Sequence, residues 1–169
     1  YRIDRARLRR LIELKIKDRR IIELMMSYAD WEEPRGLPIG NLLSQLLALI
    51  YLNPLDQYIK RKLKCERYVR YVDDFIIFGI SRETARIMLR KIEHWLIVNL
   101  GLELSRWTIQ DCRRGLNFVG FRTWRRTRFV RKRSVHRFSK SLKSGNVLSI
   151  VSVMGNARRS ATHAHFCNR

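Results

Sequence analysis

An alternating stretch with two adjacent aspartates at its centre constrains the fold most. Residues 67–79, RYVRYVDDFIIFG, are rich in β-branched and aromatic side chains, which favour paired strands. The pattern predicts a β-hairpin with strands near 67–72 and 75–79 and with Asp73 and Asp74 at its turn. The apolar strands on both sides predict that the neighbours of this turn pack against a core.

The two aspartates form a candidate site for metal-dependent chemistry. Carboxylates this close repel each other in apolar surroundings unless a cation neutralises them. Mg²⁺ prefers one or two carboxylates together with substrate phosphates, and a tight turn lets Asp73 and Asp74 reach one metal cluster. Two ions about 3.5–4 Å apart activate a 3′-hydroxyl and stabilise a leaving pyrophosphate. The pair therefore indicates nucleotidyl transfer, and a solvated Asp-rich turn is the alternative.

Charge is distributed unevenly along the chain. All 15 acidic residues lie within residues 1–111, whereas 15 of the 36 Lys and Arg follow in a segment without acids. A segment of one sign repels itself unless it faces a polyanion, so nucleic acid is the expected partner. Aromatic residues interleave with these bases, as in proteins that stack on bases and contact phosphates. They are Phe118, Phe121, Trp124, Phe129 and Phe138. Burial of these rings under a solvated basic face is the alternative.

The remaining elements follow from apolar periodicity and from capping and breaking residues. Residues 6–30 predict helix, with Asp18 as the cap of a second helix, and residues 31–40 predict a loop. A further helix is expected from Ser44, and Pro54 is expected to kink it or to split it at the preceding residue.

The second half of the chain predicts a helix, short strands and a basic helical end. Ser81 is expected to cap a helix that ends at Gly101. Beyond residue 133 the pattern is weakly helical and very basic. Short strands are expected near residues 102–110, 116–124 and 127–131. This order of elements predicts an α+β fold in which helices pack on an antiparallel sheet.

Cysteine usage and hydropathy argue against a disulfide-rich protein and against a membrane-spanning one. Cys65, Cys112 and Cys167 are too scattered for a disulfide framework or a CxxC metal site and fit a reducing compartment. His163, His165 and Cys167 form an H-x-H-x-C pattern without a fourth ligand, which is a weak metal signal. No apolar run approaches the roughly 18 residues of a membrane span, and no signal-peptide core is present. We therefore expect no membrane partner.

The sequence YVDDF at residues 71–75 resembles the YxDD motif of reverse transcriptases, and three further stretches support the resemblance. Residues 36–56, GLPIGNLLSQLLALIYLNPLD, resemble the palm loop and helix that contact the incoming nucleotide and the template. Residues 101–109, GLELSRWTI, hold the place of the next motif, and residues 115–121, GLNFVGF, resemble the primer grip. Ordered motifs at suitable spacing are more specific than any one of them alone.

The resemblance implies a right-hand polymerase palm, an antiparallel sheet backed by helices, over residues 1–131, and the start of a basic helical thumb over residues 132–169. It implies an RNA-directed DNA polymerase that uses dNTPs, a template RNA and a primer or cDNA. Asp73 and Asp74 would be the catalytic carboxylates and would bind two Mg²⁺ ions, with Mn²⁺ as the alternative metal. Lys and Arg beyond Arg122 would hold the duplex through its phosphates.

The resemblance also assigns two groups of binding residues. The nucleotide and template site would be lined by Ile39, Gly40, Ser44, Gln45 and Tyr71. The primer grip would be formed by Phe118, Gly120 and Phe121.

Residues 39–45, IGNLLSQ, narrow the resemblance. Most bacterial reverse transcriptases have Gln where this chain has Ile39 and Pro where it has Gln45. The variant resembles the enzymes of diversity-generating retroelements, which copy template adenines with errors and work with a small basic accessory protein. An aliphatic Ile39 cannot form the hydrogen bond that Gln would make to the nucleotide or the template. The enzyme is therefore expected to discriminate less well between correct and incorrect nucleotides. The alternative is that Ile39 only packs on the core. Leu43 is a smaller departure from the retroelement pattern.

Other identities stay open. A group II intron-type or retron-type reverse transcriptase and a non-catalytic RNA-binding remnant are the alternatives, and a bacterial or phage-infected cytoplasm is the expected location. The third catalytic carboxylate of the family comes from an earlier motif, whose end resembles YRIDRARLRRLI at residues 1–12. That aspartate is expected before Tyr1, so the fragment alone is expected to be inactive. Asp4 as the third ligand is the alternative.

Overall fold

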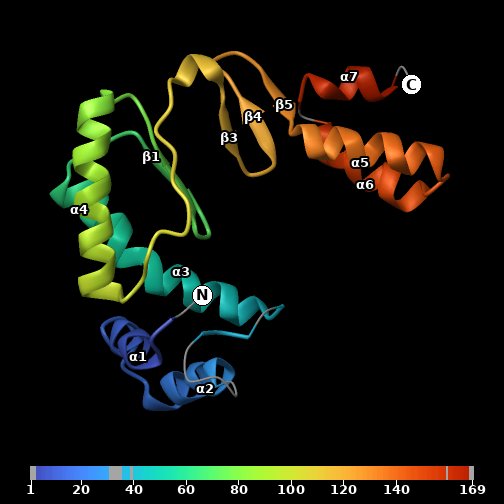
Figure 1. The fold of residues 1–169 in the computed structure, drawn as a ribbon. Coiled ribbons are helices and arrows are strands. Elements are labelled where there is room, and N and C mark those ends of the chain that lie inside the picture. Colours follow the sequence, from blue (N-terminus) through green and yellow to red (C-terminus); the bar gives the residue numbers. More distant parts are fainter. Residues whose placement is uncertain (1–2, 31–35, 39, 159, 168–169) are drawn as a thin grey trace. The chain divides into compact units, whose positions relative to one another are not determined.

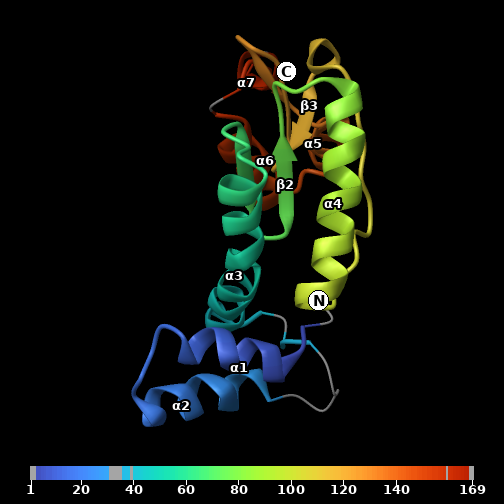
Figure 2. The same cartoon turned by 90° about the vertical axis from the view of Figure 1, so that its left-hand side faces the viewer.

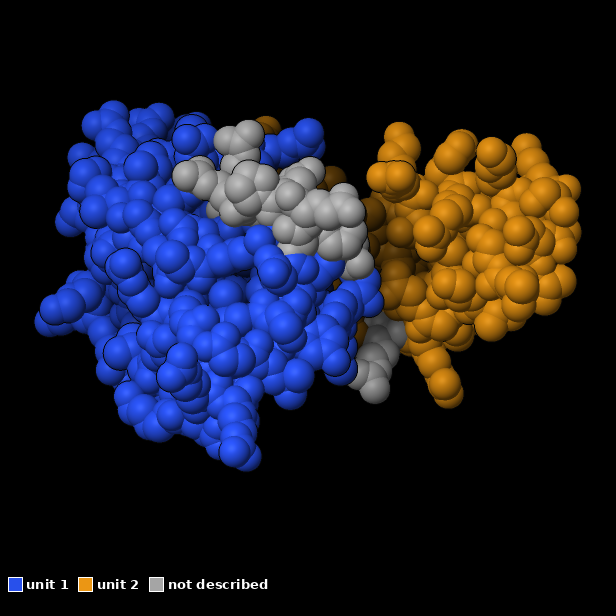
Figure 3. All heavy atoms as spheres, turned by 90° about the horizontal axis from the view of Figure 1, so that it is seen from below, with its two compact units in different colours: residues 1–109 blue, residues 110–169 orange. Residues whose placement is uncertain are grey.

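The computed structural model describes most of the chain, namely residues 3–30, 36–38, 40–158 and 160–167. The chain divides into two compact units, Tyr1–Ile109 and Gln110–Arg169, which Figure 3 shows in different colours. The palm–thumb boundary expected after residue 131 stays a prediction. Among the described residues, no helix has the length and apolar character needed to cross a membrane.

The first unit consists of helices and one hairpin (Figures 1 and 2). In chain order its elements are α1 (Arg5–Glu13), α2 (Arg19–Ala29), α3 (Leu42–Gln57), the π-helical turn η1 (Tyr58–Lys62), β1 (Tyr68–Tyr71), β2 (Asp74–Ile77) and α4 (Arg82–Leu100).

Three capping predictions are confirmed in this unit. The Asp18 side chain accepts from the backbone N–H groups of Arg20 and Ile21, so it begins α2. Ser81 caps α4 by accepting from the N–H of Thr84 at 3.0 Å. Gly101 ends α4 in the left-handed region at φ 63°, where glycine avoids the strain of a Cβ.

The core of the first unit lies around the middle of α3. Tyr51 is fully buried there, and its hydroxyl donates to the Leu100 carbonyl at 2.5 Å, which joins α3 to the end of α4. The ring of Tyr58 stacks on Trp95 with centroids 4.9 Å apart. Helices α1 and α2 pack against α3, and α3 and α4 flank the hairpin in Figure 2. The hairpin packs on this core through Tyr68, Phe75 and Ile77.

Helix α3 differs from the prediction at its start and shows no split at Pro54. It begins at Leu42, because Asn41 rather than a later residue caps it by accepting from the Leu43 N–H at 2.9 Å. It is not split at Pro54 but continues to Gln57 and into η1. The lost hydrogen bond is outweighed by burial of apolar side chains on both sides of the proline. These side chains are Tyr51, Leu52, Leu55 and Ile59.

The second unit combines a small sheet with three helices. In chain order its elements are η2 (Cys112–Arg114), β3 (Leu116–Phe118), β4 (Phe121–Thr123), β5 (Arg128–Val130), α5 (Lys132–Lys143), α6 (Val147–Ala157) and α7 (Thr162–Cys167). The strands pair antiparallel in the order β3-β4-β5. A core of Val130, Phe138, Val153, Ala157 and Phe166 joins the sheet to the helices.

Two strand predictions are wrong, and the structure has two sheets where one was predicted. Residues 102–110 form no strand, because they meet no partner strand among the described residues, although Leu102 and Leu104 pack on the first core. Residues 116–124 form a hairpin rather than a single strand, since Val119 and Gly120 turn the chain. The strands expected in one sheet form separate sheets of two and three strands. The α+β class holds, and β5 and the basic helical end are confirmed.

Candidate active site

The β1–β2 hairpin has the shortest loop that antiparallel strands permit. Tyr71 pairs with Asp74, so Val72 and Asp73 alone form the turn. Asp74 is therefore the first residue of β2 rather than part of the turn, which corrects the sequence prediction. Val72 has φ 56°. A β-branched residue in this region is strained by about 1–3 kcal/mol, and such strain persists only where the surroundings enforce it.

The tip of the hairpin presents two carboxylates to solvent. Asp73 and Asp74 are both exposed, and neither carboxylate has a hydrogen-bond or ion-pair partner among the described residues. Tyr71 beside them is 57% exposed. The prediction that the neighbours of this turn pack against a core is confirmed at Tyr68, Phe75 and Ile77, while the tip itself is exposed. Two adjacent carboxylates with free oxygens match the ligand preference of Mg²⁺.

Arg70 ties this turn to helix α3. Its Nε donates to Oδ1 of Asp56 at 2.7 Å, and its Nη2 donates to Oδ2 of the same carboxylate. Its Nη1 donates to the Val72 carbonyl at 2.6 Å. Tyr68 adds a third bond to Asp56, from its hydroxyl to Oδ1 at 2.6 Å. The Arg70 latch, defined as Arg70 with Asp56, Tyr68 and the Val72 carbonyl, holds the strained turn in place.

The latch perturbs the ionisation of its members. Burial opposes the charge of Asp56, but the hydrogen bonds from Arg70 and Tyr68 outweigh it and lower the pKa of this carboxyl. Burial, and then the hydrogen bond to Asp56, raise the pKa of the Tyr68 phenol far above its usual range. The hydrogen bond to Asp56 raises the pKa of Arg70. Near neutral pH the latch is therefore a carboxylate, a neutral phenol and a guanidinium, which is the set that forms all of these bonds.

Three of the five predicted nucleotide-site residues, Gly40, Ser44 and Gln45, lie at the N-terminal end of α3, whereas Tyr71 lies on β1. Gly40 has φ 96°, and a Cβ there would meet no atom of the described residues within 4 Å, so the backbone at this point leaves room for a ligand. Ser44 is buried, and its Oγ has no hydrogen-bond partner among the described residues. Gln45 is exposed. Ile39 lies outside the described residues.

The predicted primer-grip residues belong to the second unit. Phe118 pairs with Phe121 across a two-residue loop of Val119 and Gly120. Both loop residues have positive φ, 44° and 83°, as a type I′ turn requires. The guanidinium of Arg128 lies 5.1 Å from the centre of the Phe121 ring. The second glycine of GLNFVGF, Gly120, is thus explained by the turn itself.

A comparison with protein families decides to which family this arrangement belongs. The family model for reverse transcriptase (RNA-dependent DNA polymerase) matches residues 5–123, which is more than half of the chain. The chain belongs to the reverse transcriptase family. The matched residues include the hairpin tip, the N-terminal end of α3 and the β3–β4 turn. No curated protein matches the chain.

Membership in the reverse transcriptase family sets the general chemistry. A reverse transcriptase domain is an RNA-directed DNA polymerase domain, a nucleotidyltransferase whose substrates are a template nucleic acid and dNTPs. Reverse transcriptase domains use divalent metals. The described residues contain no group of three or more His, Cys, Asp or Glu side chains placed to hold a metal ion, so Asp73 and Asp74 stand as a pair.

The two weaker candidate ligand sets, Asp4 and the H-x-H-x-C pattern, lie at the start of α1 and in α7. Asp4 caps α1, because its Oδ1 accepts from the Arg7 N–H at 3.1 Å. The Sγ of Cys167 lies 3.8 Å from Nδ1 of His163 within the short helix α7. The His165 side chain lies outside the described residues.

Sequence reasoning missed the Arg70 latch. Its signal was present, since Arg70 interrupts an apolar strand and Asp56 follows a run of apolar helix residues. Charged residues at such positions are rarely buried unless they are paired. Finding the partners required the tertiary structure, because Asp56 and Arg70 are 14 residues apart in the chain.

Proposed function

We propose that this reverse transcriptase domain synthesises DNA on an RNA template by two-metal nucleotidyl transfer at Asp73 and Asp74. The observation that carries the proposal is the position of these carboxylates. They are adjacent, exposed and unpaired among the described residues, at the tip of a hairpin in a reverse transcriptase domain. The donor set fits hard divalent cations, which bind carboxylate oxygen.

In the proposed reaction, the residues around the hairpin tip have different roles. Asp73 and Asp74 would hold the metal ions, two Mg²⁺ with Mn²⁺ as the alternative. When bound, the ions lower the cost of ionising the primer 3′-hydroxyl and of releasing pyrophosphate. The Arg70 latch fixes the turn through the Val72 carbonyl, so that the backbone that carries both carboxylates stays in place. Exposed Tyr71, on the strand next to Asp74, would lie beneath the primer terminus.

Two further groups would position the substrates. Gly40, Ser44 and Gln45 would contact the nucleotide and the template, and the unpaired Ser44 hydroxyl supports this role, because a buried hydroxyl without a partner is costly. Phe118, Gly120 and Phe121 would hold the primer end.

We further propose that the domain belongs to the diversity-generating retroelement type and is error-prone at template adenine. The sequence IGNLLSQ at residues 39–45 supports this narrower proposal, through Ile39 and Gln45. A small basic accessory protein and a bacterial or phage-infected cytoplasm belong to the same proposal.

The polymerase proposal is tested by primer extension with the protein expressed from the reading frame that contains these 169 residues. We expect Mg²⁺-dependent extension on an RNA template, and we expect Asp73→Asn and Asp74→Asn each to lower it at least about 100-fold. Asp111→Asn is the matched control, because Asp111 bonds to Arg113 in the other unit. Protein that binds RNA but extends no primer would overturn the proposal in favour of a non-catalytic RNA-binding role.

The retroelement proposal is tested by sequencing the products. We expect wild-type protein to misincorporate opposite template adenine and Ile39→Gln to reduce these errors. An error spectrum without adenine bias in the wild type would favour a group II intron or retron type. An unchanged spectrum in Ile39→Gln would show that fidelity is set elsewhere.

A further inference from the structure

Helix α6 is apolar on two sides, although it lies in the most basic part of the chain. One side packs in the second core through Val153 and Ala157. The other side carries Val147, Leu148 and Val151, whose side chains are 67%, 86% and 62% exposed. A helix that is apolar all round is normally buried on all sides. The exposed side of α6 therefore lacks the cover that its composition predicts.

The three exposed apolar side chains share one face of the helix. Val151 follows Val147 by four residues and Leu148 by three, so the three lie within about 100° around the helix axis. Ser152 and Gly155 are exposed and continue this surface without charge. A Cβ at Gly155 would meet no atom of the described residues within 4 Å. We call the surface formed by these five residues the α6 face.

The backbone that carries the α6 face is held by the neighbouring helix. Helices α5 and α6 pack against each other (Figure 1), and the hydroxyl oxygens of Ser141 and Ser149 lie 2.8 Å apart between them. Asn146 caps α6, because its Oδ1 accepts from the Ser149 N–H at 3.0 Å. A partner would therefore meet a helix that is already formed, so binding requires little ordering of this unit.

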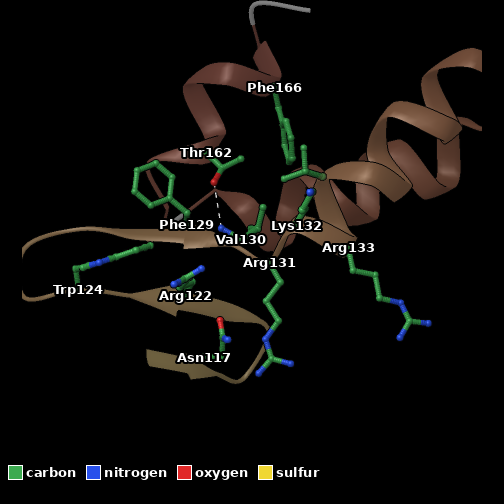
Figure 4. A pocket seen from close by; sticks show the side chains of 11 residues that line it. Asn117, Arg122, Trp124, Phe129, Val130, Arg131, Lys132, Arg133, Thr162 and Phe166 are labelled. Carbon is green, nitrogen blue, oxygen red and sulfur yellow. Dashed lines mark hydrogen bonds between the residues drawn. The ribbon is translucent and has the colours of Figure 1, made fainter. Parts of the chain in front are cut away.

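The α6 face is separate from the cavity of this unit. That cavity, about 700 Å³ in volume, lies between the sheet, the start of α5 and α7, and none of the described residues of α6 lines it (Figure 4). Thr162 lies in its wall, where its Oγ1 accepts from the Val130 N–H at 3.1 Å. The family match, which covers residues 5–123, does not include α6. A role for the α6 face thus does not follow from family membership.

Cations lie at both ends of the α6 face. Lys143 is exposed at the end of α5, before the turn into α6, and Arg158 is exposed directly after α6. Arg158 follows Val151 by seven residues, a spacing that returns to the same side of a helix. The second unit contains 15 Lys and Arg but a single acidic residue, Asp111, which is already in an ion pair. The α6 face is therefore an apolar surface in a positive field, which favours an acidic partner.

Three other occupants fit these observations less well. A second copy of the chain would bring two strongly positive units together, which is unfavourable. Nucleic acid would meet the cations but offers little apolar surface to cover valine and leucine side chains. A helix that lies in a membrane surface has a polar face opposite its apolar one, whereas the opposite side of α6 is buried in the core.

We propose that the α6 face binds an acidic amphipathic helix of a partner protein. Apolar side chains of the partner, repeated every three to four residues, would cover Val147, Leu148 and Val151. Its carboxylates would lie beside Lys143 and Arg158, which sets the orientation of the partner. This partner has the opposite charge to the small basic accessory protein proposed above, which these cations would repel. The inference goes beyond the proposed polymerase function, since the contact needs neither template nor metal.

The test measures binding of a fluorescein-labelled peptide to the full chain by anisotropy. The peptide has about 15 residues, with Leu at every third or fourth position and Glu on the other faces of the helix. A scrambled peptide of the same composition is the comparison. We expect saturable binding of the patterned peptide, about tenfold weaker binding in Leu148→Ser, and a smaller loss in Lys143→Gln that disappears at high salt. Circular dichroism checks that the variants are folded, as expected for exposed positions.

Matched controls separate the α6 face from general stickiness and from general charge. Leu24→Ser removes another exposed leucine, in the other unit, and is expected to bind the peptide like wild type. Arg126→Gln removes a charge from the loop between β4 and β5 and is expected to weaken binding less than Lys143→Gln. A peptide with Lys in place of every Glu is expected not to bind, because its charge has the wrong sign.

The inference is overturned if the scrambled peptide binds as tightly as the patterned one, or if folded Leu148→Ser binds like wild type. It is also overturned if sedimentation shows a dimer of the chain that Leu148→Ser dissociates, or if vesicles of anionic phospholipid bind through Leu148 and the peptide does not. These results would assign the α6 face to a second copy or to a lipid surface. None of them affects the polymerase proposal, which is measured by primer extension.

Discussion

Arg70 and Asp56 form a bidentate ion pair that joins strand β1 to helix α3. Nε of Arg70 lies 2.7 Å from Oδ1 of Asp56, Nη2 bonds to Oδ2, and the side chains are 10% and 21% exposed. The third nitrogen of the same guanidinium reaches the carbonyl of Val72, directly before the candidate catalytic carboxylates. A planar guanidinium can serve both partners at once, which a lysine ammonium does less well.

Arg70→Met is expected to destabilise the first unit by about 2–4 kcal/mol, because it leaves Asp56 half-buried without its cation. Arg70→Lys should cost less but should not restore the bond to the Val72 carbonyl. Urea unfolding followed by circular dichroism measures both changes. Arg86→Met, on the exposed side of α4, is the control and should stay within about 0.5 kcal/mol of wild type. Equal effects at the two positions would contradict the latch.

Acid should weaken the same contact. The pKa of Asp56 is lowered in the folded protein, so its contribution is present above the ordinary value of 3.8 and is lost as the pH falls through the folded pKa. We expect the melting temperature of wild type to drop as the pH falls from about 4 to about 2, and that of Asp56→Asn to drop less over the same range. The difference in melting temperature between wild type and Asp56→Asn removes the effect of the other acidic residues, which both proteins share. Parallel curves would show that Asp56 is not stabilised as a carboxylate.

Asp73→Asn and Asp74→Asn are expected to weaken divalent metal binding at least about tenfold, because each removes an anionic ligand from a pair. Both residues are exposed, so folding stability should stay within about 0.5 kcal/mol of wild type. Electron paramagnetic resonance of Mn²⁺ measures the affinity without any need for catalysis. Glu103→Gln removes an exposed carboxylate elsewhere in the unit and should bind metal like wild type. Unchanged affinity in both aspartate variants would exclude a metal site at the hairpin.

Val72→Gly should stabilise the domain by about 1 kcal/mol, since relief of strain at φ 56° exceeds the entropy that glycine adds to the unfolded chain. Val69→Gly, in strand β1, is the matched control and should destabilise by about 1 kcal/mol. Thermal unfolding of the two variants measures the contrast. Destabilisation of similar size at both positions would show that the turn is not strained.

Tyr51→Phe should destabilise the first unit by about 1–2 kcal/mol, because the buried Leu100 carbonyl loses the hydroxyl that donates to it. The exposed Tyr28 supplies the control, and Tyr28→Phe should change stability by less than about 0.5 kcal/mol. Urea unfolding of both variants measures the effect. A similar loss in both would mean that the Tyr51 hydroxyl contributes no specific contact.

Local chemistry in the sequence determined much of the fold. Asp18, Ser81 and Gly101 mark helix ends through contacts with residues at most a few positions away, so their roles follow from sequence alone. The hairpin around Asp73 and Asp74 follows from alternation and from its turn. The family motifs are also short and local, so the amino-acid sequence by itself is enough to predict family membership.

Tertiary structure decided what depends on contacts between distant residues. Helix α3 passes through Pro54 because a core on both sides stabilises it, and residues 102–110 form no strand because no partner strand lies beside them among the described residues. The Arg70 latch likewise requires a strand and a helix to meet. A single sequence records which side chains are present and their local preferences. Packing decides which of them pair, since burial and hydrogen bonding between distant residues outweigh local propensity.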